Sequence, residues 1–364
     1  MHETRVHIVG GFLGSGKTTA IAAASRQLIG AGLRVGVVTN DQGRYLVDTL
    51  FFEMEQVPAV EVSGGCFCCN YDDFEERLAS LAESARPDVI FAESVGSCAD
   101  VVATVVQPLE TLGKSGFRPA GLSVFADSRL LRLYLEGQPL PFSPEVVYIF
   151  EKQLEEAGQI VVNKADLLDA SALGAVLCAA QARYPRAAVR AQDSRQAGDI
   201  AQWLQGIESG EASTASILEE IDYDRYAAGE AELAWLDQEI RIRVEEGRAR
   251  HAVQDVLTRI EGRIRDSGWG VGHLKFVVRD GNEQAKLSAT AMPADDWLSG
   301  LPLLRGGTLS LLINARVATT AEALQECVRY CIEEAAAQQE FAWNLQSTEC
   351  FHPGYPVPRH RLGA

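Results

Sequence analysis

A short glycine-rich segment near the amino terminus has the residue types of a phosphate-binding loop. It reads Gly11-Phe12-Leu13-Gly14-Ser15-Gly16-Lys17-Thr18, and its spacing fits the phosphate-loop pattern. The apolar run Arg5–Val9 precedes it and the helical pattern Lys17–Gly30 follows. Glycines let backbone N–H groups turn toward a β-phosphate, and the helix N-terminus adds positive potential. The residues that we expect to bind nucleotide here are Gly11, Gly14, Ser15, Gly16, Lys17, Thr18 and Thr19.

Three of these side chains have distinct predicted tasks. Lys17 is expected to contact the β- and γ-phosphates, and the Thr18 hydroxyl to bind Mg²⁺. Thr19 is placed where it would contact the α-phosphate.

A second motif, Asn163-Lys164-Ala165-Asp166, follows an apolar strand. Asp166 can accept hydrogen bonds from the ring N–H and the exocyclic amine of guanine. Adenine has no such donor pair, so it would leave a buried carboxylate without partners and be rejected. Lys164 would cover the base with its methylene stem and Asn163 would brace the loop. The pattern predicts GTP rather than ATP as the nucleotide.

Magnesium-dependent hydrolysis needs a carboxylate near the γ-phosphate. Glu93 ends the strand pattern Asp88–Ala92 and Asp41 ends the strand pattern Leu33–Asn40. Either can hold Mg²⁺ directly or through water, and we assign catalytic roles to Lys17, Thr18, Asp41 and Glu93. The Gly96 backbone would approach the γ-phosphate. The sequence does not indicate which residue positions the attacking water, so slow intrinsic GTP hydrolysis is expected.

The segment Gly64-Gly65-Cys66-Phe67-Cys68-Cys69 places three cysteines in four positions. In an extended chain Cys66 and Cys68 would share one side, and Cys69 would fold round after them. Thiolates select Zn²⁺, Co²⁺, Ni²⁺ or Cu⁺ over Mg²⁺, and three protein ligands leave one coordination position open. The alternative is that the three cysteines serve as small buried apolar residues.

Composition excludes several classes of function. The 364 residues carry a net charge of −17, which opposes binding to nucleic acid or to anionic membranes. We found no stretch of about 18 apolar residues of the kind that a membrane helix needs. The eight cysteines are not spaced like a secreted disulfide framework. The sequence therefore predicts a cytoplasmic protein with reduced thiols.

The first 206 residues alternate short apolar runs with helical patterns, which predicts an α/β domain with a mainly parallel sheet, of the phosphate-loop NTPase kind. Ligands in such folds bind at the carboxyl ends of the strands. Residues 207–229 have little apolar pattern and are predicted to be a linker. Residues 230–364 are predicted to form a smaller α+β domain of helix, strand and hairpin, and the order of these elements suggests a ferredoxin-like fold.

Together these motifs resemble the G3E class of phosphate-loop GTPases, and within it the cobW-like branch of metal chaperones. The matching segments are Gly11–Thr19, Gly65–Cys69, Glu93–Gly96 and Asn163–Asp166. The resemblance implies GTP hydrolysis with Mg²⁺, coupled to the handling of Zn²⁺ or Co²⁺ for a client protein. The client would be a metalloenzyme or a cofactor-dependent enzyme. A homodimer is one candidate assembly.

The sequence departs from this family at two places. The stretch after Asp41 reads Gln42-Gly43-Arg44, where the family commonly has an aromatic or aliphatic residue, a Gly and then an acidic residue. Cys98 stands in the segment that in the family usually leads to a proline, and it is a candidate extra metal ligand. The tail with Cys350, His352 and His360 offers either further ligands, a partner contact, or an ordered segment packed on the second domain.

Three functions fit the sequence. In the first, GTP hydrolysis gates the transfer of metal to a client. In the second, the nucleotide state controls the maturation of a cofactor enzyme, with a corrinoid enzyme as one candidate, and the cysteines only sense metal. In the third, the protein is a zinc store with vestigial hydrolysis.

Overall fold

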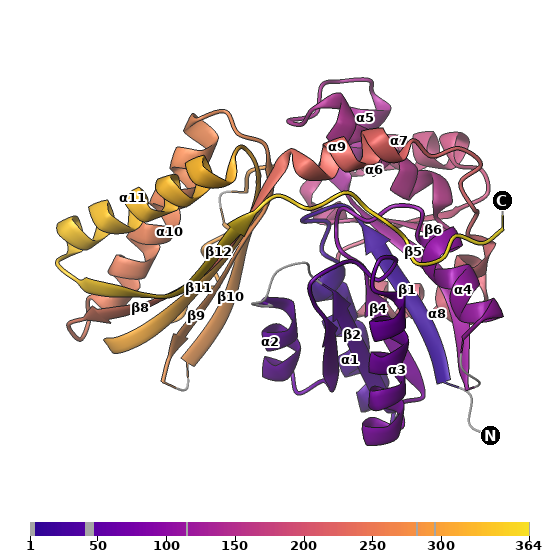
Figure 1. The fold of residues 1–364 in the computed structure, drawn as a ribbon, viewed down its shortest axis with the longest axis horizontal. Coiled ribbons are helices and arrows are strands. Elements are labelled where there is room, and N and C mark those ends of the chain that lie inside the picture. The colour runs from indigo at the N-terminus through magenta and orange to yellow at the C-terminus, as the bar shows by residue number, and fades with distance from the viewer. Residues whose placement is uncertain (1–3, 41–46, 114–115, 282, 295, 364) are drawn as a thin grey trace. The chain divides into compact units, whose positions relative to one another are not determined.

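The computed structural model describes residues 4–40, 47–113, 116–281, 283–294 and 296–363. It divides into two compact units. The first contains a parallel sheet with helices and the second contains an antiparallel sheet with helices (Figure 1). This confirms the predicted fold class, a phosphate-loop NTPase domain followed by a smaller α+β domain.

The first unit is built on a seven-stranded sheet in the order β3-β2-β4-β1-β5-β6-β7. Every strand pair in it is parallel, so all the carboxyl ends lie at one edge. Its strands are β1 (Thr4–Gly11), β2 (Val35–Asn40), β3 (Ala59–Val62), β4 (Val89–Glu93), β5 (Phe117–Asp127), β6 (Gln159–Asn163) and β7 (Ala188–Gln192).

Helices cover both faces of this sheet. Its helices are α1 (Lys17–Gly30), α2 (Val47–Met54), α3 (Tyr71–Ala85), the π-helix η1 (Val102–Val106), α4 (Gln107–Thr111), α5 (Ser128–Leu135), α6 (Pro144–Glu156), the 3-10 helix η2 (Ala165–Leu167), α7 (Ala170–Arg183), α8 (Ala197–Glu208), the 3-10 helix η3 (Glu211–Thr214) and α9 (Tyr223–Ala231). On one face, Ile21 of α1 and Trp203 of α8 share a fully buried cluster with Val37. On the other face, Leu81 of α3 lies over Gly36, where a Cβ would come within 2.6 Å of the leucine Cδ2.

The segment predicted to be a linker is partly helical. Residues 207–229 include the end of α8, all of η3 and most of α9, and they belong to the first unit. Tyr226 of α9 is buried in a cluster with Tyr148 and Ile149 of α6. Aromatic contacts with α6, which is distant in sequence, stabilise this segment. The local sequence pattern does not reveal such contacts, so the segment was predicted to be a linker.

The second unit has a five-stranded antiparallel sheet in the order β10-β9-β11-β8-β12. Its elements are β8 (Leu233–Val244), α10 (Ala249–Asp266), β9 (Val271–Asp280), β10 (Glu283–Thr290), β11 (Gly307–Ala318), α11 (Ala321–Gln339) and β12 (Ala342–Phe351). Without the edge strand β10, the chain order is the βαββαβ of a ferredoxin-like fold. Both helices share one apolar core with the sheet.

The C-terminal residues do not stay with the second unit. Glu230–Gly354 form that unit, and the tail from Tyr355 onward belongs to the first. The predicted second domain, 230–364, therefore differs from the observed unit at its end. Among the described residues, no helix combines the length and apolarity that crossing a membrane requires.

Candidate nucleotide and metal site

Candidate site residues, of which Asn40 alone was not predicted, stand at the ends of four neighbouring strands at the same edge of the parallel sheet. The phosphate loop follows β1, Asn40 ends β2, the cysteine loop follows β3, and Glu93 ends β4. These four strands are adjacent in the order β3-β2-β4-β1. The crevice outside the carboxyl ends is where open α/β sheets bind ligands.

The phosphate loop has a backbone that only glycine accommodates at two positions. Gly11 has φ +124°, and a Cβ there would lie 2.2 Å from the Phe125 carbonyl oxygen. Gly16 has φ +93°, and a Cβ there would lie 2.3 Å from Asn163 Nδ2. Lys17 is buried and its Nζ donates to the carbonyl oxygen of Gly11 at 2.6 Å. The loop therefore folds back on its lysine, whose ammonium group lies against the carbonyl oxygens of Gly11 and Phe12.

The Thr18 hydroxyl lies between two carboxylates. Thr18 Oγ1 donates to Glu93 Oε1 at 2.9 Å and is 3.3 Å from Asp48 Oδ1. These oxygens are the hard ligands that Mg²⁺ prefers. Glu93 was predicted from the sequence, whereas Asp48, in the first turn of α2, was not. Asp41, the other predicted carboxylate, lies outside the residues that the structure describes.

Gly96 contacts the phosphate loop itself. A Cβ on Gly96 would lie 2.7 Å from Leu13 Cδ2 and 3.0 Å from Leu13 Cα. The absence of a side chain thus allows the segment after β4 to pack directly on the loop. Thr19, which we expected at the α-phosphate, has an exposed side chain in the first turn of α1.

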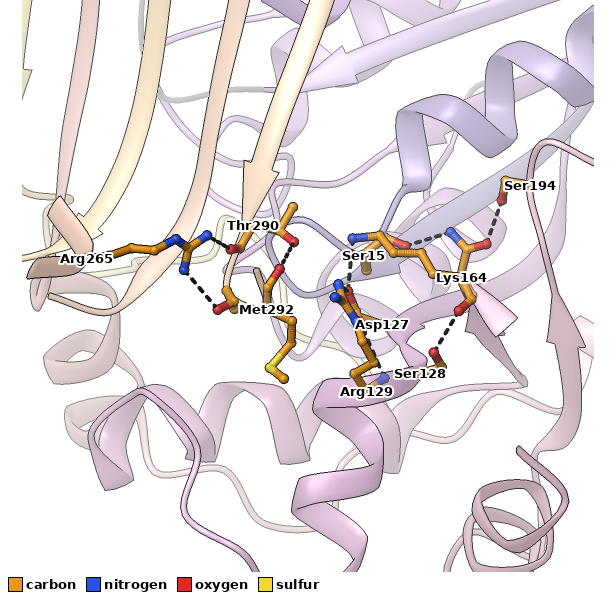
Figure 2. A network of polar contacts seen from close by, with 11 residues as sticks. Ser15, Asp127, Ser128, Arg129, Lys164, Ser194, Arg265, Thr290 and Met292 are labelled. Carbon is orange, nitrogen blue, oxygen red and sulfur yellow. Dashed lines mark hydrogen bonds and ion pairs between the residues drawn. The ribbon is translucent and has the colours of Figure 1, made fainter. Parts of the chain in front are cut away.

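The base-reading motif is tied to the phosphate loop. Asn163 Nδ2 donates to the carbonyl oxygen of Ser15 at 2.8 Å, and Asn163 Oδ1 accepts from Ser194 Oγ at 2.8 Å. Both contacts are drawn in Figure 2, where Ser15 and Ser194 are labelled. The Asn163 side chain thus links the phosphate loop to the loop after β7, which is consistent with the bracing role predicted for it.

Lys164 has a left-handed backbone, with φ 57° and ψ 40°, which is uncommon for a residue other than glycine. Its Nζ donates to Asp127 Oδ2 at 2.9 Å, and its carbonyl oxygen accepts from Ser128 Oγ at 2.8 Å (Figure 2). Burial opposes ionisation of Asp127, but Lys164 and Arg129 outweigh it and lower the pKa of this carboxyl group. The charged pair therefore fixes the position of the Lys164 side chain.

Asp166 forms an ion pair that the sequence analysis did not anticipate. Arg195 Nη2 lies 2.6 Å from Asp166 Oδ2, and Arg195 Nε lies 3.0 Å from Asp193 Oδ1. Arg195 follows β7, a strand that was also not predicted. A prediction of β7 as an edge strand, followed by the polar turn that carries Arg195, would have placed this arginine near Asp166.

The cysteine loop is a turn rather than the extended segment that we expected. The N–H groups of Cys69 and Asn70 both donate to the carbonyl oxygen of Cys66, at 3.1 and 2.9 Å. The turn brings the three sulfur atoms within 4.8 Å of one another. Cys66 and Cys68 are buried and Cys69 is partly exposed. The three sulfur atoms are therefore close enough to bind one ion, as predicted, but a turn and not an extended segment brings them together.

The three thiols differ in acidity. Hydrogen bonds from the neighbouring thiols lower the pKa of Cys66. Hydrogen bonding to Cys66 raises the pKa of Cys68, and it raises the pKa of Cys69 to about 11. A metal ion binds thiolates, so it would displace the protons that remain on these groups.

Asn40, at the end of β2, holds the cysteine loop in place. Its Nδ2 donates to the carbonyl oxygens of Val62 and Gly65, at 3.0 and 2.8 Å. Its Oδ1 accepts from the N–H of Phe67 at 2.9 Å. One buried amide thus fixes the backbone on both sides of Cys66.

The C-terminal tail lies against the same loop. The N–H of Arg359 donates to the carbonyl oxygen of Cys68 at 2.8 Å. The His360 ring packs edge-on against Tyr71, with centroids 5.2 Å apart. Cys350 and His352 instead contact Ala321 in the second unit. These three residues therefore do not gather into one further ligand set.

The fold and these loops define a phosphate-loop nucleotide-binding protein with a thiol cluster at the nucleotide edge of its sheet. Residues 5–189 match the family described as CobW/HypB/UreG, nucleotide-binding domain. The match covers half of the chain, and the chain belongs to this family.

Two curated relatives are similar to this chain. The zinc chaperone CobW of Sinorhizobium sp is 32% identical over 191 residues, which are 46% of this chain and 53% of the relative. The zinc chaperone CobW of Pseudomonas aeruginosa is 26% identical over 215 residues, which are 52% of this chain and 56% of the relative. The chain thus spans about half the length of these curated relatives.

Among solved structures, the Zn(II)-bound YjiA GTPase of E. coli has 12% identity and a TM-score of 0.40, over 91% of this chain and 99% of that chain. HypB of Helicobacter pylori in complex with nickel has 17% identity and a TM-score of 0.43, over 59% of this chain and 92% of that chain. Likenesses this low add nothing to the family assignment.

Proposed function

We propose that this protein is a Mg²⁺-dependent GTPase that uses its nucleotide cycle to control Zn²⁺ or Co²⁺ at Cys66, Cys68 and Cys69. The metal is cargo, and the proposed recipient is a client metalloenzyme or a cofactor-dependent enzyme in the cytoplasm. Family membership and the names of the zinc chaperone relatives support this proposal.

One observation carries it: the thiols and the phosphate loop stand at the same edge of one sheet, after β3 and β1, with only β2 and β4 between them. Asn40 hydrogen-bonds both flanks of Cys66 from the end of β2. Glu93 ends β4, next to β2, and contacts Thr18. Because β2 pairs with β4, a change at the γ-phosphate would reach the cysteine loop through Glu93, these two strands and Asn40.

The residues of the nucleotide site fit GTP and Mg²⁺. The loop glycines open a concave backbone, and Lys17 supplies a positive charge for the β- and γ-phosphates. Thr18, Glu93 and Asp48 supply oxygen ligands of the hard kind, and bound Mg²⁺ would neutralise charge on the phosphates. Asp166 would select guanine, and Arg195 is placed to hold that carboxylate in position. Asp41 remains a predicted participant.

The thiol site fits a soft cation and its later release. Three sulfur atoms on one turn favour Zn²⁺ and Co²⁺ over Mg²⁺. Cys69 is the partly exposed member of the set, so a client thiol or imidazole can approach from its side. Ligand exchange at that side would move the ion without exposing it to bulk water.

The test is GTP turnover by the full chain with and without one equivalent of Zn²⁺, under anaerobic conditions. We expect Zn²⁺ to raise turnover and Cys68→Ser to abolish the rise. The matched control is Cys178→Ser, because Cys178 is an exposed thiol on α7, and it should behave like the wild type. Turnover that responds only to a client protein would favour a conformational chaperone that senses metal. Stoichiometric Zn²⁺ with no response to GTP would favour a zinc store.

A further inference from the structure

The C-terminal residues 355–363, called the tail below, lie against the cysteine loop. They belong to the first unit and form neither helix nor strand; Figure 1 shows them in yellow, ending at the label C. The N–H of Arg359 donates to the carbonyl oxygen of Cys68 at 2.8 Å, and the N–H of Leu362 donates to that of Ala103 at 2.9 Å. The tail therefore reaches from the thiol loop to η1.

The tail is anchored by an ion pair with a buried carboxylate. Arg361 Nε donates to Asp100 Oδ2 at 2.8 Å, and Arg361 Nη2 donates to the carbonyl oxygen of Leu218 at 3.0 Å. Asp100 is fully buried, and its Oδ2 also accepts from the Tyr223 hydroxyl at 2.7 Å. Among the described residues, Asp100 Oδ1 has no hydrogen-bond partner. Because an unpaired buried charge is costly, this carboxylate favours a bound guanidinium group.

The surface beneath the tail is held by hydrogen bonds that do not involve the tail. The N–H and Oγ1 of Thr104 both donate to the carbonyl oxygen of Asp100, at 3.1 and 2.6 Å. The N–H of Ala99 donates to the hydroxyl oxygen of Tyr226 at 3.3 Å. These contacts fix the backbone on both sides of the anchor, so the anchor is preformed and does not depend on the tail.

The tail and the surface beneath it are complementary in charge. The tail contains Arg359, His360 and Arg361 and no acidic residue, in a chain with a net charge of −17. Arg359 Nε lies 3.5 Å from Asp72 Oδ2. Beside Arg361 is a shallow hollow of about 490 Å³, whose other lining residues are Glu219, Glu220, Ile221, Asp222 and Tyr223. Such a surface fits a basic segment of chain.

The tail is held mainly by polar contacts, which suits reversible displacement. Pro356 is buried, whereas the other side chains of the tail are exposed or half-buried. Pro356 and Pro358 fix φ, so an extended segment of this kind has less backbone freedom to lose on binding. A chain terminus with few apolar contacts opens at a small cost compared with the core. Another extended segment with the same features can therefore take its place.

We propose that the surface beneath the tail is a docking groove for a basic, extended segment of the client, and that the tail is an intramolecular competitor for this groove. The inference rests on the proposed function for the identity of the occupant, because a recipient of the metal has to reach the thiol loop. The groove receives an arginine at Asp100 and a backbone N–H at the carbonyl oxygen of Cys68. A client segment bound there displaces the tail and brings the client to the partly exposed Cys69.

The first test measures the affinity of the full chain for a fluorescent peptide with the sequence of residues 355–364, without metal and without nucleotide. The tethered tail competes at an effective concentration on the order of 1 mM, so the wild type should bind the peptide weakly. Arg361→Ala loosens the tail and leaves the groove intact, so it should bind at least about tenfold more tightly. Arg186→Ala, at an exposed arginine of the same unit, is the matched control and should behave like the wild type. Equal affinities of the wild type and Arg361→Ala would overturn the competition.

A second variant separates the groove from the tail. Asp100→Asn also loosens the tail, but it removes the charge that receives the arginine. It should therefore bind the peptide at least about tenfold more weakly than Arg361→Ala does. A peptide with alanine in place of Arg361 should show the same loss on the Arg361→Ala protein. Equal binding of the two peptides would show that the groove does not recognise the arginine, and the proposal would fail.

A measurement on the wild type decides the question if the variants misfold. Hydrogen exchange at the amides of Arg359 and Leu362 should be at least about tenfold slower than in an unstructured chain, because each N–H is hydrogen-bonded. Unprotected exchange at both amides would overturn the proposal. These experiments contain neither metal nor nucleotide, so their failure leaves the proposed function standing. A Zn²⁺ affinity that is independent of nucleotide would instead overturn the proposed function and leave the peptide groove in place.

Discussion

Replacing Asn40 by alanine should weaken metal binding without touching a metal ligand. The side chain makes three hydrogen bonds at 2.8 to 3.0 Å, to Val62, Gly65 and Phe67. Two of these partners, Gly65 and Phe67, flank Cys66 in the turn that converges the thiols. Without them the loop must order itself when the ion binds, and that cost lowers the affinity.

The size of the effect follows from the count of hydrogen bonds. Each net hydrogen bond contributes about 1 kcal/mol, and a buried donor left unpaired, such as the Phe67 N–H, costs about 1–3 kcal/mol. The two loop contacts together are thus worth about 2 kcal/mol, which corresponds to about a 30-fold loss of Zn²⁺ affinity. Asn40→Asp keeps the acceptor for Phe67 but loses both donors, so its affinity should lie between those of the wild type and Asn40→Ala.

The assay is anaerobic competition for Zn²⁺ against a chromophoric chelator, with GTP affinity measured in parallel as a check on the fold. Asn344→Ala is the matched control, because Asn344 is an exposed asparagine on β12. It should bind Zn²⁺ like the wild type. Wild-type Zn²⁺ affinity in a folded Asn40→Ala protein would refute the idea that this amide preorganises the thiols.

Three further predictions concern other parts of the first unit. Asp48→Asn should raise the Mg²⁺ concentration required for GTP turnover about tenfold, as the loss of a metal-orienting carboxylate does elsewhere, and a Mg²⁺ titration measures this. Burial lowers the pKa of His7 from 6.5 to about 4, so between these pH values the imidazole is protonated only in the unfolded state. The free energy of unfolding should therefore fall by up to about 3 kcal/mol as the pH drops from 6.5 to 4. Urea unfolding of His7→Gln should lack this part of the pH dependence. Deletion of residues 355–364 should speed alkylation of Cys68 and Cys69, because the tail backbone covers the loop, and equal rates by mass spectrometry would argue against such cover.

Local patterns predicted the parts of the site whose geometry is local. The phosphate loop is one continuous strand–glycine–helix segment, so residue spacing alone defines it. The Asn163–Asp166 motif and the cysteine cluster are likewise contiguous. The second unit was also predictable, because its long amphipathic helices and its hairpin carry clear periodicity; β9 and β10 pair as that hairpin.

Contacts between distant segments were not predictable in the same way. Asp48 contacts Thr18 across 30 residues of sequence, and Arg195 reaches Asp166 because β7 pairs with β6. β7 itself is only partly buried along most of its length, so its apolar signal is weak. The cysteine loop was predicted to be extended, because alternate residues of an extended chain lie on the same side. In the structure a turn held by Asn40 brings the three sulfur atoms together instead.

The central claim is that nucleotide and metal occupy coupled sites on one edge of the sheet. The most direct measurement is the Zn²⁺ dissociation constant of the full chain, without oxygen, with a GTP analogue and Mg²⁺, with GDP and Mg²⁺, and without nucleotide. Coupling of about 1–3 kcal/mol is typical of linked sites, so we predict constants that differ by about tenfold or more between the GTP and GDP states. Identical constants under all three conditions would contradict the account.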